Sequence, residues 1–422
     1  MRILISGGGV AGPSLAFWLS KLGHDITLVE RWPTLRTTGQ QIDLRGPGIQ
    51  VMKRMGLMNL FRSYAVSERG LQFVDDSGRQ KVFFPVSKSG TGLQSFTTDY
   101  EIMRGDLCRM LYGVTKDKVK YVFGTHIASL EPRDDAVTVA LSDGSVDRFD
   151  LVVGADGQGS RTRKMILGSH DPDPFHYLGL YISYFTISRR EEDEYVSTLY
   201  NVPRKRFVFT RRHDEDTMQA YLGICGTEAE LKELGEGDVA EQKKAYAEKF
   251  ADAAWETPRI IRDMQDSEVA MDFFSQKVGQ VKLDAWSRGR VVLLGDAAYC
   301  PSPATGMGTT SGLVGAYVLA GAISKHCSDR DSVESSKDAL LAALQEYYTE
   351  FRPFIEQVQN LGPGMPRIGL PATRWGITAM HSFLWLSRSL GIDAVAQWFL
   401  RESNVWDLPS YESMDNLVIH EE

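Results

Sequence analysis

The first thirty residues constrain the fold of this chain more than any other segment. An apolar run from Arg2 to Ser6 is followed directly by Gly7-Gly8-Gly9-Val10-Ala11-Gly12. Residues 13–22 then have the pattern of a helix, and residues 25–29 that of a second strand, with Glu30 at its end. A glycine-rich turn between a strand and a helix predicts a β-α-β unit that binds a dinucleotide.

The chemistry of these residues suggests their roles. Gly7, Gly9 and Gly12 permit a tight turn, the close approach of a pyrophosphate and the packing of the helix on the strand. Glu30 can accept hydrogen bonds from ribose hydroxyls. The motif alone does not separate FAD from NAD. The alternative is a chance glycine turn, which the full β-α-β context disfavours.

Two further motifs follow apolar strands. The first runs from Gly154 to Arg163 and contains Asp156-Gly157 and Ser160. The second is Gly295-Asp296-Ala297-Ala298, which leads into a Pro- and Gly-rich loop at 301–308. An aspartate at the carboxyl end of a strand can bind a ribityl hydroxyl, and glycines let backbone N–H groups face a phosphate or an electron-rich ring. The simpler interpretation of both motifs is a loop with a helix cap.

Length and composition limit the class of protein. A chain of 422 residues predicts two or three domains, or two interleaved ones, and 43% apolar with 24% charged residues predicts a folded chain. A net charge of −8 without a long basic run argues against a nucleic-acid partner. The four cysteines are scattered and form no CxxC motif, which indicates reduced thiols and no metal site. Since no secretory signal is recognised, we expect a cytoplasmic location. The uncharged runs at 297–324 and 375–387 do not fit a transmembrane span, although the second is able to lie on a membrane or a partner.

The order of predicted elements indicates an α/β fold with an insertion. We expect a Rossmann-like dinucleotide-binding domain, discontinuous over 1–70, 97–170 and 281–330, because apolar strands at 151–153 and 290–294 return to the first unit. Alternating strands predict an inserted antiparallel-sheet substrate domain over 71–96 and 171–280. Helical patterns predict a C-terminal helical region over 331–422.

Together the three motifs resemble the single-component FAD-dependent monooxygenases with the p-hydroxybenzoate hydroxylase fold. The resemblance covers residues 1 to about 325 and includes the GxGxxG turn, the DGxxSxxR pattern from Asp156 and the GD motif at Gly295. Gln41-Ile42-Asp43-Leu44-Arg45-Gly46 and the overall length are similar to the tetracycline-inactivating members. Two positions depart from the family pattern: Tyr299 stands where His often follows GDAA, and Thr310 replaces a frequent Asn.

The resemblance implies a set of cofactor contacts. Glu30 and Arg31 would hold the adenosine ribose, Arg104 the phosphates or ribityl chain, and Asp296 the ribityl or pyrophosphate region. The full set of implied FAD-binding residues is Gly7, Gly9, Gly12, Glu30, Arg31, Arg104, Asp156, Arg163, Asp296, Pro303, Gly306 and Gly308. Asp156 and Arg163 belong to a motif linked to both FAD and NAD(P)H use.

Fewer residues can be assigned to catalysis or to substrate contact. Asp43 matches an acidic position near the flavin, and Tyr221 lies where related enzymes present a polar ring to substrate, so we assign both to catalysis. A core tyrosine is the alternative for Tyr221. Arg206 and Arg211 could bind an anionic or enolic substrate, but we expect both arginines to lie on the surface at a sheet edge. Met365, Trp375, Met380 and Phe383 fit an apolar core stripe better than a pocket cap.

The resemblance also implies the reaction. NAD(P)H reduces the flavin, oxygen adds to give a C4a-hydroperoxide, and one oxygen atom enters an aromatic, polyketide-like or alkaloid-like molecule in a water-excluding pocket. The alternative is an FAD-dependent oxidase or dehydrogenase without oxygen insertion, and a flavin-bound sensor or membrane-associated scaffold is a third reading. We expect a monomer or weak homodimer.

Overall fold

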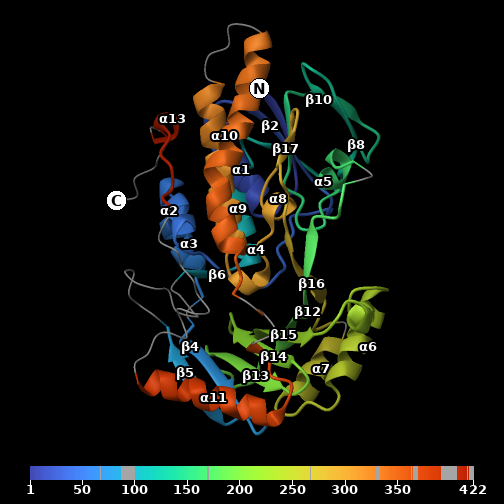
Figure 1. The fold of residues 1–422 in the computed structure, drawn as a ribbon, viewed down its shortest axis with the longest axis vertical. Helices are drawn as coiled ribbons and strands as arrows, with labels where there is room; N and C mark the ends of the chain where they lie inside the picture. Colours follow the sequence, from blue (N-terminus) through green and yellow to red (C-terminus); the bar gives the residue numbers. More distant parts are fainter. Residues whose placement is uncertain are drawn as a thin grey trace.

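The computed structural model describes most of the chain in two lobes. The described residues are 1–66, 68–86, 100–168, 171–266, 268–327, 333–362, 364, 369–390, 406–415 and 417. The upper lobe in Figure 1 contains the N-terminus and the long helices, and the lower lobe contains a broad sheet. The long strands β12 and β16 run from the lower sheet toward the upper lobe.

The upper lobe is built on a mostly parallel sheet. Its order within the described residues is β17 (Ser287–Arg288), β18 (Val291–Leu293), β11 (Leu151–Gly154), β1 (Arg2–Ser6), β2 (Asp25–Glu30) and β7 (Lys120–Phe123). All neighbours pair in parallel except β17 with β18. The central strands are apolar on both faces because helices and loops cover both sides, as a parallel sheet requires.

Helices bury one face of this sheet in the largest hydrophobic core. α1 (Ala11–Lys21) packs against α9 (Gly308–His326), and α9 packs against α10 (Val333–Gln359). α9 is buried along most of its length, which explains why residues 297–324 carry no charge. The neighbouring helices are α2 (Pro47–Arg54), α3 (Met58–Tyr64), α4 (Arg104–Thr115), α8 (Asp296–Tyr299) and α13 (Glu412–Asp415).

Two smaller sheets complete the upper lobe. An antiparallel sheet has the order β10 (Val146–Phe149), β9 (Val137–Leu141) and β8 (Ile127–Pro132), with α5 (Arg161–Ile166) beside β8. β3 (Gln41–Asp43) and β6 (Glu101–Met103) form a two-stranded ribbon, in which Asp43 pairs with Glu101. This ribbon carries polar residues to the boundary between the lobes.

The lower lobe is a mostly antiparallel sheet. Its order is β16 (Phe274–Val281), β12 (Phe175–Ser188), β15 (Thr217–Cys225), β14 (Arg206–Arg212), β13 (Ser197–Val202), β4 (Gly70–Val74) and β5 (Gln80–Pro85). One face packs on η1 (Ala229–Leu234), α6 (Val239–Phe250) and α7 (Thr257–Gln265). Because side chains alternate along each strand, the residues between those core positions point to the opposite face, toward the upper lobe. α11 (Arg374–Ser389) packs on β5 along the bottom of the lobe.

The expected fold class is confirmed, and most predicted strands and helices lie within two residues of the observed ones. Two sequence patterns are misleading. Residues 47–63 have the pattern of one helix, but the structure has two helices that break at Gly56, which has φ +69°. The segment at 101–103 is a strand rather than the start of a helix. α7 and β16 were not predicted. In the predicted C-terminal helical region, α11 is described from Arg374 to Ser389. Residues 87–96 of the predicted insert and Met365 lie outside the described residues.

Candidate active site

One large cavity lies between the two lobes, with a volume of about 1140 Å³. Its walls come from the carboxyl ends of β1, β2 and β11, from the loop before α9, and from the upward face of the lower sheet. Ligands bind at this edge of an open α/β sheet because the turns that leave the strands point their N–H groups there.

The glycine turn forms one end of the cavity. A Cβ on Gly7, which has φ +119°, would lie 2.3 Å from the carbonyl oxygen of Ala155, so only glycine fits. A Cβ on Gly12 would lie 2.0 Å from the carbonyl oxygen of Gly7. The Glu30 carboxylate accepts hydrogen bonds from the N–H groups of Gly8 at 2.7 Å and Trp32 at 3.0 Å. Glu30 therefore lies at the turn with its carboxylate facing the same cavity.

The second motif braces this end. Both carboxylate oxygens of Asp156 are used within its own loop: Oδ2 accepts from the N–H groups of Arg161 and Thr162 at 2.9 and 3.0 Å, and Oδ1 accepts from the Ser160 hydroxyl at 2.5 Å. The guanidinium of Arg163 donates to the carbonyl oxygens of Ala297 at 2.9 Å and Gln158 at 2.6 Å. These bonds join the second motif to the third and fix the shape of the wall.

The third motif forms the middle of the cavity. Asp296 begins α8 and is half-buried, and burial raises the pKa of its carboxyl group, which the Cys300 thiol opposes by a hydrogen bond. Pro303, Gly306 and Gly308 follow along the wall. α9 starts at Gly308 without a side-chain cap, so the N–H groups of its first turn are open to the cavity.

The structure brings most of the predicted site residues together. All those assigned to FAD or catalysis line this cavity except Gly12, which is buried beneath the turn. Tyr299 points away into the core, where its ring contacts Trp286 and Phe351 and its hydroxyl accepts from Tyr347 at 3.1 Å. Thr310 accepts a hydrogen bond from the N–H of Arg45 at 3.0 Å and holds the segment after β3.

The residues of this wall suit FAD. α1 and α9 both begin at the cavity with uncapped first turns and no acidic residue there, which favours an anionic pyrophosphate at one and an electron-rich ring edge at the other. Arg31, Arg36 and Arg104 supply cations near Glu30. Arg36 was not predicted, and no motif marks it in the sequence. It lies over the rings of Trp32 and Phe274, at 5.8 and 5.4 Å from their centroids, and so connects the two lobes.

The far end of the cavity is apolar and aromatic. The upward face of the lower sheet supplies Leu180, Ile182, Tyr184, Leu199, Phe207, Phe209 and Tyr221. A Cβ on Gly223 would lie 1.9 Å from the Phe207 ring, so this glycine makes room for the ring. Tyr184 and Tyr221 pack edge to face, with their ring centroids 4.9 Å apart. The wall is suited to a flat, largely apolar molecule.

A buried polar group interrupts this wall where the lobes meet. Arg211 binds Glu68 through two hydrogen bonds of 2.8 Å and also binds Glu101, which accepts a further hydrogen bond from Gln41. We call Arg211, Glu68, Glu101 and Gln41 the Arg211 cluster. The surface position expected for Arg211 was wrong because its partners come from distant segments. Arg206 is also buried, and its guanidinium binds Asp252 on the other side of the sheet.

The two residues assigned to catalysis lie beside this cluster. Asp43 accepts a hydrogen bond from Nε of Arg45 at 2.6 Å, and both side chains are nearly buried. The Tyr221 hydroxyl is buried and has no hydrogen-bond partner of good geometry among the described residues. Burial raises the pKa of Tyr221 to about 12, although Arg211 opposes the shift. Tyr221 is therefore a neutral hydroxyl at the cavity wall.

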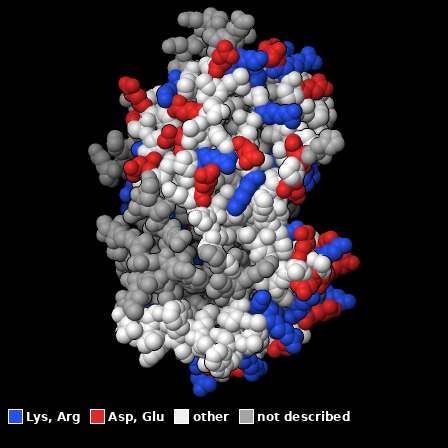
Figure 2. Space-filling view, in the orientation of Figure 1, with Lys and Arg blue, Asp and Glu red and all other residues white. Residues whose placement is uncertain are grey.

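Two of the apolar residues near the C-terminus, Trp375 and Phe383, differ from the expectation. Trp375 and Phe383 were assigned to a core stripe, but 82% and 60% of these side chains are exposed on α11. Met380 does pack on the outside of the lower sheet, with Val82 and Leu384. Figure 2 shows a largely uncharged surface at the lower left, in the region of α11. No described helix is both long and apolar enough to cross a membrane.

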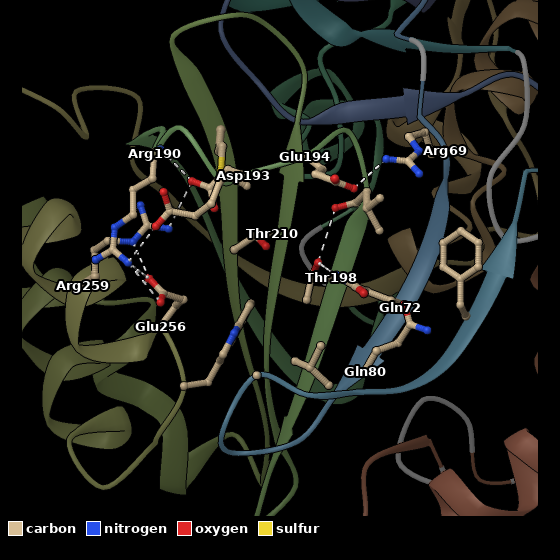
Figure 3. Close-up of a pocket in the computed structure, with 17 residues that line it drawn as sticks. Arg69, Gln72, Gln80, Arg190, Asp193, Glu194, Thr198, Thr210, Glu256 and Arg259 are labelled. Atoms are coloured by element: carbon tan, nitrogen blue, oxygen red, sulfur yellow. Dashed lines mark hydrogen bonds and ion pairs between the residues drawn. The ribbon is translucent and has the colours of Figure 1, made fainter.

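A second cavity of about 470 Å³ lies on the other face of the lower sheet. Figure 3 shows that its charged side chains point at one another: Arg259 binds Glu256 at 2.7 Å, and Arg69 binds Glu194 at 2.6 Å. Gln72 donates to Thr198 at 2.9 Å. The sheet separates this cavity from the glycine turn, so the large cavity is the candidate active site.

Comparison with known proteins agrees with this geometry. A family model described as FAD binding domain matches residues 1–360. The FAD-dependent monooxygenase asL4 of Sarocladium schorii is 42% identical over 98% of this chain and 99% of that protein. The flavin-dependent monooxygenase eupH of a Phoma species is 40% identical over 90% of each chain. The crystal structure of the tetracycline destructase Tet(51) is 28% identical, covers 97% of this chain and 99% of its own, and superposes with a TM-score of 0.75.

The fold and the cavity thus define an FAD-binding oxidoreductase. The chain belongs to the FAD binding domain family and is a single-component FAD-dependent monooxygenase. The resemblance drawn from the three sequence motifs is confirmed.

Proposed function

We propose that this enzyme uses NAD(P)H and O₂ to insert one oxygen atom into an aromatic, polyketide-like or alkaloid-like small molecule. Bound FAD would supply the redox chemistry, since it accepts electrons from a nicotinamide and reacts with oxygen. The residues Gly7, Gly9, Glu30, Arg31, Arg104, Asp156, Arg163, Asp296, Pro303, Gly306 and Gly308 would hold or frame it.

The observation that carries this proposal is the continuity of the cavity. A single space runs from the glycine turn, past the start of α9, to the aromatic wall of the lower sheet. An apolar wall next to the redox group excludes water and so favours transfer of oxygen to the substrate over release of hydrogen peroxide. Two relatives are named as monooxygenases, which supports the reaction. The name of the tetracycline destructase supports a polycyclic, polyketide-like substrate.

The test is a turnover screen with the FAD-loaded enzyme. Phenols, polyketides, tetracyclines and indole alkaloids are supplied with NADH or NADPH, and we measure oxygen uptake and product mass. We expect the amount of oxygen consumed to equal the amount of product formed, and the product to gain the mass of one oxygen atom. Turnover under nitrogen with an artificial electron acceptor and no gain of oxygen would instead identify an oxidase or dehydrogenase. The control variant is Glu30→Lys, which places a cation at the predicted ribose site and should therefore bind FAD more weakly and turn over less substrate.

A further inference from the structure

α11 lies on the outside of the lower lobe, along its bottom edge (Figure 1). Its inner face is fixed on the sheet. Leu384 packs with Val82 of β5, and the ring of His381 lies 5.8 Å from that of Phe73, measured between centroids. Nε2 of His381 also lies 3.2 Å from Oδ1 of Asn201. One face of the helix therefore already has its partners within the protein.

The outer face of α11 is apolar as well. Trp375, Phe383, Leu386 and Leu390 follow one another at steps of eight, three and four residues, which places them along one side of the helix. Each exposes half or more of its surface, and so does Trp385 on the flank. We call these five residues the α11 patch. No other described helix contributes more than two exposed large apolar residues. Single exposed apolar residues are ordinary, but a contiguous group indicates a docking surface.

The charged residues of α11 are all basic. They are Arg374 and Arg388, one at each end, about 21 Å apart along the helix axis. Arg374 approaches Asp76 at 3.9 Å, and in the adjacent hairpin Lys81 pairs with Asp75 at 3.3 Å. Arg388 makes no ion pair with a described residue. The surface beside α11 therefore has a positive charge, at Arg388, that no acid in the described part of the chain balances.

An apolar face with basic ends fits an anionic lipid surface. Tryptophan, phenylalanine and leucine side chains insert at the boundary between headgroups and acyl chains, and arginines bind the phosphates there. A second copy of the chain fits less well, because a stable protein interface uses about 20–30 residues on each side. The α11 patch supplies five, all on or next to one helix. The charge and the size of the patch therefore favour a bilayer.

The helix is joined directly to the wall of the large cavity. Gly369 and Leu370 line that cavity, and Leu370 packs with Tyr184 and Tyr221 of the aromatic wall. α11 begins at Arg374, so at most about 14 Å of extended chain separates the helix from Leu370. Docking through α11 would therefore hold the aromatic end of the cavity near the bilayer, where apolar small molecules concentrate.

We propose that α11 docks this enzyme on the surface of an anionic bilayer. The helix lies parallel to the surface, the α11 patch inserts among the lipid chains, and Arg374 and Arg388 bind lipid phosphates at its two ends. The inner face of α11 keeps its contacts with the sheet, so docking needs no unfolding. This property goes beyond the proposed reaction and does not depend on it, because an enzyme without turnover docks equally well.

The first experiment measures co-sedimentation of the full-length, FAD-loaded enzyme with vesicles. Vesicles of phosphatidylcholine with about 30% phosphatidylserine should bind it at least about tenfold more tightly than phosphatidylcholine alone. Replacing Trp375 and Phe383 together by Ser should weaken this binding at least about tenfold. Arg388→Gln should weaken it about fivefold, on the anionic vesicles alone. The matched control replaces Val239 and Met271 by Ser, two exposed apolar residues elsewhere in the lower lobe, and should bind as the wild type does.

A second experiment locates α11 at the membrane. Lipids brominated on the acyl chain should quench the tryptophan fluorescence of the bound enzyme, and replacing Trp375 and Trp385 together by Phe should keep the binding but remove most of the quenching. This measurement decides the question if the serine variant does not fold. Equal binding to both kinds of vesicle, wild-type binding by the serine variant, or quenching that persists in the phenylalanine variant would overturn the proposal. A dimer that dissociates in the serine variant, without vesicle binding by the wild type, would assign the α11 patch to contact between two copies and also overturn it.

Discussion

The aspartates of the two later motifs have different surroundings. The carboxylate oxygens of Asp156 accept backbone and hydroxyl hydrogen bonds within their own loop, so Asp156 holds the shape of the wall. Asp296 is half-buried beside the start of α9, and a Cβ on Gly308 would lie 3.9 Å from its Oδ1. A charged acceptor in this place is suited to a ligand hydroxyl. We therefore expect the two positions to respond differently to mutation.

Replacing Asp296 by Ala should give a folded protein that binds FAD about 10- to 150-fold more weakly, because one hydrogen bond to a charged group contributes about 1.5–3 kcal/mol. Flavin absorbance after dialysis against limiting FAD measures the loss. As a control, Asp284→Ala changes an exposed aspartate in a loop and should retain the wild-type flavin content. Full flavin content in the Asp296 variant would remove this residue from the cofactor site.

At the scale of elements, sequence patterns predicted those parts of the fold that depend on local signals. The strand-turn-helix of residues 2–22 and the hairpin β4–β5 carry glycine turns and regular alternation. β16 was missed because Gln276 and Lys277 interrupt its apolar pattern, and its pairing with β12 is a long-range contact. Arg211 was expected at the surface for the same reason, since Glu68 and Glu101 approach it only in the folded chain.

Two glycines on different helices should respond in opposite ways to the same change. Gly113 of α4 is exposed and a Cβ there would meet nothing within 4 Å, so Gly113→Ala should raise the free energy of unfolding by about 0.5–1 kcal/mol. A Cβ on Gly315 of α9 would lie 1.9 Å from the Tyr299 hydroxyl oxygen, so Gly315→Ala should lower it by about 1–3 kcal/mol. Urea unfolding at saturating FAD measures both. A stabilising Gly315→Ala would show that the core around Tyr299 is loosely packed.

At the scale of the whole molecule, the cavity joins segments that are far apart in the sequence. Glu30 at the end of β2, Asp156 after β11 and Asp296 after β18 all line it. Arg36 from the upper lobe lies over Phe274 of the lower one, and the Arg211 cluster joins the β3–β6 ribbon to the lower sheet. A ligand that fills this space binds only the folded chain, so its binding energy adds to the stability of the fold.

Added FAD should therefore raise the free energy of unfolding by about 1.4 kcal/mol for each tenfold increase in concentration above its dissociation constant. Thermal melts over a series of FAD concentrations measure this slope. Because Glu30 lies at the glycine turn, where the adenosine ribose is expected, Glu30→Lys should move the FAD series to higher concentration without changing its slope. FMN, which lacks the adenosine half, should stabilise the wild type and the Glu30 variant equally. A Glu30→Lys protein that loses FMN and FAD stabilisation to the same extent would place Glu30 outside the adenosine end of the cavity.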